Sequence, residues 1–290
     1  MATGHPMRLK LQEIKAQFDL LSVGKSSLLS MIDEAEIAES VYNSNAIENS
    51  TLTLKETEKI LLDMELSRNV SLREIFEAKN LARVIKYISS KFRKDALSKD
   101  LILLLHKMLI ENINEKIAGR FRSHGEYVRV GTHIAPAPQQ IEGMISSILI
   151  EYSSNQNSYF LDKIAKFHLD FETIHPFNDG NGRMGRILIN YQLFGLGFPA
   201  IIIRNKEKLN YNISFNDYQI SKITKPMEKI LALALTESLH KRITYLRDLK
   251  IIPLSDYVKE SGKSPSAVFN LAKRQTISAF REKGIWKIGV

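Results

Sequence analysis

The stretch IHPFNDGNGRMGR, residues 174–186, holds a histidine, a carboxylate, three glycines and two arginines within thirteen positions. Pro176 disfavours helical geometry at the residue before it, so a helix should end at His175. Gly180 and Gly182 then allow a tight turn before a second helix begins. The backbone amides of this turn would therefore point outward from a helix N-terminus, where an anion binds favourably.

The side chains around this turn suit phosphate chemistry. Asn181 can donate a further hydrogen bond, while Arg183 and Arg186, one helical turn apart, can bind phosphate oxygens. Asp179 is a hard oxygen ligand suited to Mg²⁺ that is shared with substrate phosphates. His175 can accept a proton from an attacking hydroxyl, because the ordinary pKa of imidazole lies near neutral pH. Together these groups predict nucleotidyl or phosphoryl transfer.

The same run matches nine defined positions of the Fic family signature, H-P-F-x-[DE]-G-N-G-R-x-x-R, and closely resembles that family from about residue 40 to about residue 245. The resemblance implies a helical domain that transfers AMP from ATP to a serine, threonine or tyrosine hydroxyl of a target protein. His175 would be the general base, Asp179 the Mg²⁺ ligand and Asn181 a contact to the transferred phosphate. The resemblance also assigns nucleotide binding to Gly180, Gly182, Arg183 and Arg186, and makes Phe177 a buried anchor.

A second motif bears on whether such an enzyme is active. Residues 44–49, SNAIEN, match the family's inhibitory pattern [ST]-x-x-x-E-[GN] through Ser44, Glu48 and Asn49. A spacing of four places Ser44 and Glu48 on one helical face. By resemblance Glu48 would bind Arg186 and displace the ATP γ-phosphate from its productive position. The same pair is also common on exposed helices, and only its occurrence beside a Fic-like motif favours inhibition.

Residues 119–131 resemble the family's flap, a hairpin that positions a target by pairing with its extended backbone. The alternation near the end of this segment predicts a short strand or hairpin. A surface hairpin without any function would show the same alternation. The residues expected to dock the target are Tyr127, Val128, Arg129 and Val130.

The C-terminal sequence predicts a separate small module. Residues 254–262 and 263–274 suggest two helices around a glycine turn, and 277–288 suggests a hairpin with Gly284 near its tip. This arrangement resembles a winged helix-turn-helix of the excisionase-like kind. Residues 251–290 carry a net charge of +4. That charge is compatible with DNA binding, although such modules also dock proteins or form dimers. The phosphate contacts considered are Lys273, Arg274, Arg281 and Lys283.

Helical signals dominate the 290 residues, of which 44% are hydrophobic. Thr53 and Ser71 each begin a capping box and are expected to open long helices. We expect a mainly α fold, namely a Fic-type helical bundle with a short β-hairpin flap and a small C-terminal winged-helix-like domain. Further helices are predicted over 98–111, 139–153, 159–174, 183–196 and 226–249. The expected division is 1–110 for an N-terminal helical region with the inhibitory helix around 40–49, 111–248 for the Fic core and 249–290 for the C-terminal module.

Charge and composition limit the partners. A formal charge of +9 favours anionic partners, and the absence of cysteine excludes disulfides and thiolate metal sites. No run approaches the roughly 20 apolar residues of a membrane helix. We therefore expect no membrane partner and a cytoplasmic location.

Two other patterns are weaker. Residues 22–26, SVGKS, resemble part of a P-loop, but Asp19 occupies the position of its first glycine. His168 and Glu172 lie four residues apart, yet no second histidine completes a zinc motif. A helix cap or loop and a hydrogen-bonded core histidine are the favoured interpretations.

The sequence thus predicts an autoinhibited protein adenylyltransferase that uses ATP and Mg²⁺. It does not identify the protein substrate, and it is compatible with self-modification and with a homodimer. Removal of AMP with Glu48 orienting water, or transfer of another phospho-group, stays open. An alternative from another functional class is a DNA-binding regulator with a nucleotide-sensing core. Transfer requires His175 and removal requires Glu48, whereas DNA-linked regulation requires Lys273 and Arg274.

Overall fold

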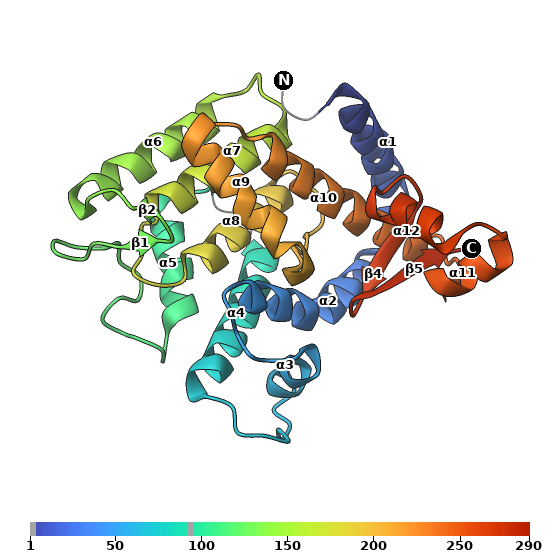
Figure 1. Cartoon of the computed structure of the whole chain (residues 1–290), viewed down its shortest axis with the longest axis horizontal. Coiled ribbons are helices and arrows are strands. Elements are labelled where there is room, and N and C mark those ends of the chain that lie inside the picture. The colour runs from blue at the N-terminus through green and yellow to red at the C-terminus, as the bar shows by residue number, and fades with distance from the viewer. Residues whose placement is uncertain (1–3, 92–95) are drawn as a thin grey trace.

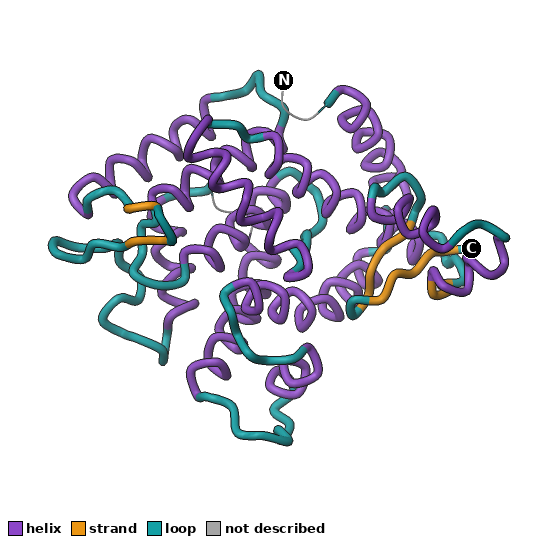
Figure 2. The backbone as a smooth tube through the Cα atoms, in the orientation of Figure 1, coloured by secondary structure: helices purple, strands orange, loops and turns teal. Residues whose placement is uncertain are grey.

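The computed structural model describes residues 4–91 and 96–290. Helices dominate it, with two small antiparallel sheets on opposite sides (Figures 1 and 2), which confirms the mainly α fold. The helices are α1 His5–Ser22, α2 Ser26–Ile47, α3 Leu54–Leu61, α4 Leu72–Lys91, α5 Lys99–Ile110, α6 Ile141–Ser154, α7 Phe160–Ile174, α8 Asn181–Gly195, α9 Lys208–Ser221, α10 Lys225–Leu246, α11 Leu254–Ser261 and α12 Pro265–Lys273. Short 3₁₀ turns occupy Pro138–Gln140 and Asn205–Glu207, and the strands are β1 Arg129–Val130, β2 His133–Ile134, β3 Ile251–Pro253, β4 Ala279–Glu282 and β5 Ile285–Gly289.

The two predicted capping boxes differ. Thr53 Oγ1 accepts a hydrogen bond from Glu56 N at 3.2 Å, and the Glu56 carboxylate accepts one from Thr53 N at 2.8 Å, so this box is complete. The helix that follows has only eight residues, and the expectation of a long helix there is wrong. A cap fixes where a helix begins but not where it ends. At Ser71 only half of the box forms, because the Glu74 carboxylate bonds the backbone amide of Thr51 at 2.7 Å.

Two large hydrophobic clusters form the body. The first gathers side chains of α4, α5, α7 and α8, and the second those of α1, α7 and α10. α7 serves both, with Phe171 in the first and Leu169 in the second, and α2 contributes Val41 and Ile47 in the same way. The N-terminal helices therefore share their core with the central ones. No described helix has the length and apolar composition needed to cross a membrane.

The other predicted helices form within a few residues of the expected bounds. α8 begins at Asn181 rather than at Arg183, because Gly180 already serves as its N-cap. α10 ends at Leu246 rather than at residue 249. Helix ends are set by local contacts that hydrophobic spacing does not encode.

The predicted hairpin is shorter than its sequence pattern. Only Arg129 and Val130 of the expected strand 127–130 pair, with Ile134 and His133 respectively. The His133 ring nitrogen lies 2.9 Å from the backbone oxygen of Thr173. That contact places the hairpin beside the C-terminal end of α7.

The C-terminal segment folds as predicted into two short helices and a hairpin. A three-stranded sheet in the order β3-β5-β4 packs with α11 and α12 around its own small core. Lys283 and Gly284 form the hairpin turn, both with positive φ. Lys273 and Arg274 are exposed at the end of α12. Arg281 is not free for phosphate, because Glu237 binds its guanidinium at 2.5 Å.

The turn of this hairpin lies against α2. The amides of Lys283 and Gly284 each donate to the Glu39 carboxylate at 3.0 Å. Arg204 binds the same carboxylate and also binds Glu237 of α10 at 3.0 Å. The C-terminal module is therefore joined to the middle of α2 by a buried network of charges, which we call the Glu39 network.

Candidate active site

His175 lies where α7 ends, as Pro176 predicts. It adopts a left-handed conformation with φ of 49°, and its amide donates to Phe171 O at 2.9 Å. Arg122 holds this bend, donating from Nε to His175 O at 2.8 Å and from its own amide to Pro176 O at 2.9 Å. The buried Arg122 guanidinium thereby replaces the hydrogen bonds that the helix end leaves unmade.

Phe177 anchors the loop from below. Its fully buried ring stacks on His106, with ring centroids 3.6 Å apart. The His106 Nδ1 accepts from Gly119 N at 3.1 Å, so Nε2 carries the proton and donates to Asp179 O at 3.0 Å. Burial lowers the pKa of His106 to about 4, which keeps this ring neutral.

The loop turns at Gly180, whose φ of 83° favours glycine and which is the N-cap of α8. The Asn181 side chain closes the turn, accepting from Phe177 N at 2.9 Å and donating to Phe177 O at 2.8 Å. Asn181 is 2% exposed. Its expected contact to phosphate stays a prediction, since these bonds leave only one amide hydrogen for a ligand.

The first arginine and the acidic residue of the loop hold each other. Arg183 Nη2 lies 3.1 Å from Asp179 Oδ1, and its Nη1 lies 3.3 Å from Glu77 of α4. Arg73 of α4 binds the other Asp179 oxygen. Asp179 therefore faces two arginines, and either a metal or a phosphate would exchange with these ion pairs.

The second arginine contacts the SNAIEN segment, residues 44–49. Arg186 Nη2 binds Glu48 Oε1 at 2.7 Å and Ser44 O at 2.8 Å, while its Nε donates to Ser44 Oγ at 2.9 Å. Ser44 thus binds the arginine directly, in addition to its place in the helix. Asn49 follows with φ of 69° and accepts from Lys208 Nζ at 2.6 Å.

The Glu48 carboxylate also covers the start of α8. A Cβ added at Gly182 would overlap Glu48 Oε1, so a larger residue there would displace the acid from this position. Burial would raise the pKa of Glu48, but the charge and hydrogen bond of Arg186 outweigh it and leave this pKa lowered. Glu48 is therefore ionised at neutral pH and occupies the anion-binding end of α8.

Comparisons with known proteins agree with this geometry. Residues 96–193 match the family model described as Fic/DOC family. The chain is 30% identical over 207 residues to the protein adenylyltransferase Fic of Nematostella vectensis, covering 70% of this chain and 48% of that protein. It also resembles a Fic domain containing signaling protein from Bacteroides thetaiotaomicron VPI-5482, with a TM-score of 0.74 and 24% identity over 82% of this chain and 97% of that one. For a Fic family protein from Desulfovibrio desulfuricans G20, the TM-score is 0.66 and the identity 20%, covering 99% of this chain and 97% of that one.

This chain contains a Fic/DOC family domain. The two solved structures, at 20% and 24% identity, show its fold. The chain spans about half the length of the curated relatives that it matches, covering 48%, 40% and 57% of three of them.

The electrostatics of the Fic domain correct one expectation. We expected the His175 imidazole to keep its ordinary pKa, but burial lowers that pKa to about 4. Its Nδ1 lies 4.0 Å from Glu172 Oε2. Burial also raises the pKa of Glu172 to about 8, so this carboxyl is mainly protonated at neutral pH. A neutral base and a neutral acid therefore lie side by side at neutral pH.

His168 lies beneath Arg186 as a core histidine. Its Nε2 is 2.7 Å from Tyr211 Oη, which in turn accepts from Arg186 Nη1 at 3.5 Å. Burial lowers the pKa of His168 to about 3. Across residues 4–91 and 96–290, no group of three or more histidines and carboxylates is arranged to hold a metal.

Several supporting residues of the Fic domain escape sequence reasoning. His106 interrupts an apolar run, which is the only signal that it has a polar partner. Arg73 and Arg122 carry no local signal, because their partners are 106 and 53 residues away along the chain. The predicted DNA-contact residues Lys273 and Arg274 lie across the molecule from the flap (Figure 1).

Proposed function

We propose that this chain transfers AMP from Mg·ATP to a hydroxyl of a protein, and that Glu48 restrains the reaction. The observation that carries the proposal is the loop from His175 to Arg186, which brings a general base beside a helix N-terminus with two arginines. The name of the Nematostella vectensis relative, protein adenylyltransferase Fic, supports the same activity.

The free amides at the start of α8 would bind the phosphates of ATP, with Gly180 and Gly182 allowing close approach. Arg183 and Arg186 would bind the remaining phosphate oxygens after leaving Asp179 and Glu48. The target hydroxyl oxygen attacks the α-phosphorus, and the bond from that phosphorus to the β-phosphate oxygen breaks, so that pyrophosphate leaves. His175 accepts the hydroxyl proton.

A base with a pKa of about 4 is weak but always unprotonated at neutral pH. Phosphates bound beside His175 would raise that pKa, because a nearby negative charge favours the imidazolium. The substrate itself would therefore strengthen the base at the moment when it is needed.

The donor set fits Mg²⁺ held mainly by substrate. Mg²⁺ commonly takes one or two protein carboxylates together with phosphates and water, and Asp179 is the carboxylate that the loop supplies. When bound, the ion would neutralise phosphate charge. Asp179 must leave Arg73 and Arg183 for this, and its place as the ligand is part of the proposal.

Restraint rests on the contact of Glu48 with Arg186. An arginine held by Glu48 and Ser44 is not available to the γ-phosphate, and the Glu48 carboxylate repels anions from the same helix end. The flap, through Tyr127 to Val130, would pair with the extended backbone of the target. The compartment, the oligomeric state and DNA binding through Lys273 and Arg274 stay predictions.

Removal of AMP is a second candidate, because Glu48 lies over the start of α8 where a water would attack. Its lowered pKa makes Glu48 a weak base while it pairs with Arg186. Transfer is therefore the better-supported direction in this conformation.

Intact-protein mass spectrometry after incubation with Mg·ATP tests the proposal. We expect Glu48→Gly to gain AMP, wild type to gain much less, and Glu48→Gly combined with His175→Ala to gain none. The matched control is Glu48→Gly with His5→Ala, which removes an exposed histidine of α1 and should leave the gain intact. If no variant gains AMP alone or with a cell lysate as target, transfer of AMP is wrong. Loss of gain in the His5 control would instead argue against a specific role for His175.

A further inference from the structure

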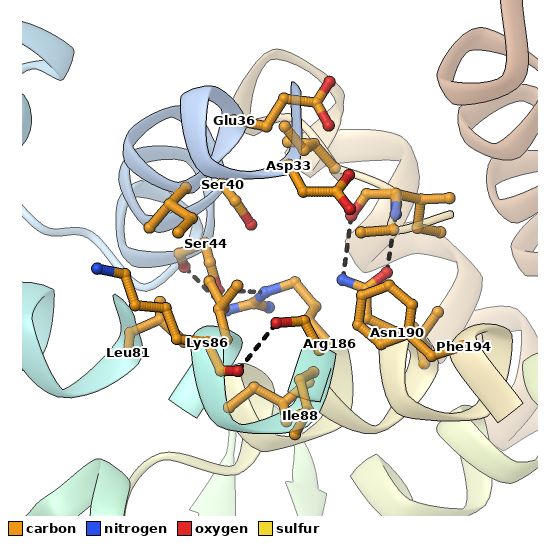
Figure 3. A pocket seen from close by; sticks show the side chains of 18 of the residues that line it. Asp33, Glu36, Ser40, Ser44, Leu81, Lys86, Ile88, Arg186, Asn190 and Phe194 are labelled. Carbon is orange, nitrogen blue, oxygen red and sulfur yellow. Dashed lines mark hydrogen bonds between the residues drawn. The ribbon is translucent and has the colours of Figure 1, made fainter. Parts of the chain in front are cut away.

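A cavity of about 360 Å³ lies between α2, α4 and α8, and the backbone at 200–203 closes part of it (Figure 3). Arg186 lies at one end, between the cavity and the phosphate-binding loop. From there the cavity follows α8 past Asn190 to Phe194, away from the loop. It lies where the two large hydrophobic clusters of the body would otherwise meet.

The walls are mainly apolar. One face of each of the three helices contributes side chains at helical spacing. The main apolar groups are Ile37 of α2, Leu81, Ile85 and Ile88 of α4, and Ile187 and Phe194 of α8. A volume of this size, with walls that expose more apolar than polar surface, is at the small end for sites that bind small molecules.

The buried and half-buried charged groups around the cavity already have partners, whereas Glu34 and Lys86 lie exposed at its edge with no ion pair to a described residue. Asp33 and Glu36 bind Arg242, and Arg186 binds Glu48. A charged ligand would therefore lose water without gaining a free counter-charge at these residues.

The neutral polar side chains of the cavity wall, Asn190 and Ser40, further limit the class of ligand that would bind. The Asn190 side chain binds the backbone of Ile201 through both its oxygen, at 2.8 Å, and its nitrogen, at 3.1 Å. The Ser40 hydroxyl makes no hydrogen bond to any described residue, and it faces the cavity from α2. One neutral polar group of a ligand could bind it.

We propose that this cavity is an effector site for a small, neutral, mainly apolar molecule with one hydroxyl or carbonyl group, and that its occupation strengthens the pairing of Glu48 with Arg186. The regulatory part rests on the proposed function of Glu48, whereas the binding site itself does not.

The coupling follows from the residues that the cavity shares with the inhibitory contact. Ser44 and Arg186 both line it, and their hydrogen bonds hold α2 against α8. The cavity has its present shape while Glu48 is paired. A ligand that fits this shape binds the paired state best and therefore increases its population. Mg·ATP requires Arg186 to be released, so the two ligands oppose each other.

Binding is tested with 4-fluorobenzyl alcohol, followed by fluorine NMR on the full chain. Its charged analogues 4-fluorobenzoate and 4-fluorobenzylamine test the preference for a neutral ligand. Ser89 and Ser90 of α4 are matched, because both are exposed and each hydroxyl donates to the carbonyl three residues earlier at 2.9 Å. Only Ser89 lines the cavity.

We expect saturable binding of the alcohol to wild type and to Ser90→Trp, and at least tenfold weaker binding to Ser89→Trp. Both charged analogues should bind at least tenfold more weakly than the alcohol. Equal binding of the alcohol to the two tryptophan variants would overturn the site, and tighter binding of a charged analogue would overturn the ligand class.

The coupling between the cavity and the contact of Glu48 with Arg186 is tested by ligand binding, without any measurement of AMP transfer. Glu48→Gly should bind the alcohol at least fivefold more weakly than wild type, within the usual range for coupled sites. Mg·ATP should weaken binding of the alcohol to wild type but not to Glu48→Gly. An equal effect of Mg·ATP on both proteins would mean direct competition, and the cavity would then belong to the nucleotide site. Failure of AMP transfer with these binding results intact would overturn the proposed function alone.

Discussion

The middle and the C-terminal end of α2 contact the rest of the molecule in different ways. At its C-terminal end Glu48 has a 41% exposed side chain and one ion pair, to Arg186. In its middle Glu39 has a 6% exposed side chain, binds Arg204 and accepts from two backbone amides of the β4–β5 turn. Both acids bind arginine, but only Glu48 retains access to water. Water can therefore replace one contact and not the other.

This difference gives the middle and the C-terminal end of α2 separate tasks. The Glu39 network includes Glu237 and Arg281 and is enclosed by α2, α10 and the C-terminal module, so its charges depend on each other. In the contact of Glu48 with Arg186, by contrast, the acid side chain is 41% exposed while the arginine is 7% exposed. α2 is thus anchored in its middle and more exposed at its end, as the proposed restraint by Glu48 requires.

The largest expected effect comes from breaking the buried contact. Arg204→Ala leaves Glu39 without its arginine and leaves Glu237 with Arg281 alone, and should lower the free energy of unfolding by about 3–5 kcal/mol. Urea unfolding measures this, with the exposed neighbour Lys206→Ala as control. A loss below about 1 kcal/mol would show that the network does not anchor α2.

Acid should unfold the protein before it releases Glu48. Burial lowers the pKa to about 4 for His106, His175 and His240 and to about 3 for His168. Unfolding takes up protons at these histidines below pH 6.5. Their contribution to stability is therefore fully present above that pH and is lost as pH falls towards 4, by up to about 1.4 kcal/mol per histidine and pH unit.

Glu48, with its lowered pKa, should stay ionised over the same range. Urea unfolding and AMP transfer of the wild-type protein, both measured at pH 7, 6 and 5, separate loss of stability from release of Glu48. A rise in AMP transfer on acidification, without loss of stability, would mean that acid releases Glu48 from Arg186 in the folded protein. That result would contradict this prediction.

Ser44→Ala should release Arg186 in part. It removes the hydroxyl that accepts from Arg186 Nε but keeps Glu48 in place. Loss of one hydrogen bond of about 1 kcal/mol corresponds to a rise in AMP transfer of roughly fivefold. The rate should stay below that of Glu48→Gly, and Ser147→Ala on α6 serves as a control with an unrelated helical serine. A rate equal to that of wild type would mean that Ser44 is not part of the restraint.

The smallest change in stability is expected from a substitution of Glu48, at the exposed C-terminal end of α2. Glu48→Gln keeps the shape of the side chain, and Arg186 keeps both contacts to Ser44. We expect the free energy of unfolding to change by less than about 1 kcal/mol, as for other partly exposed ion pairs. Urea unfolding beside Arg204→Ala makes the comparison direct. A loss of unfolding free energy as large as that of Arg204→Ala would show that the C-terminal end of α2 is as structural as its middle.

The sequence predicted the loop well because its determinants are local. Pro176 ends one helix, Gly180 caps the next, and both act through backbone geometry that needs no distant partner. The SNAIEN pattern likewise indicated the contact of Glu48 with Arg186, through the resemblance to the Fic family. The length of α3 and the extent of the flap strand were predicted less well, because helix ends and strand pairing depend on what packs against them.

By itself the sequence therefore determined the helical character, the bend at His175, the turn at Gly180 and the small C-terminal module. Each follows from torsional preference, capping or hydrophobic spacing within a few residues. Only the tertiary structure decided that Arg122 and His106 hold the loop and that burial lowers the pKa of His175. It also decided that Glu39 joins α2 to the C-terminal module and that a cavity lies behind Arg186. These features depend on burial and on partners far apart in the chain, which local sequence patterns do not specify.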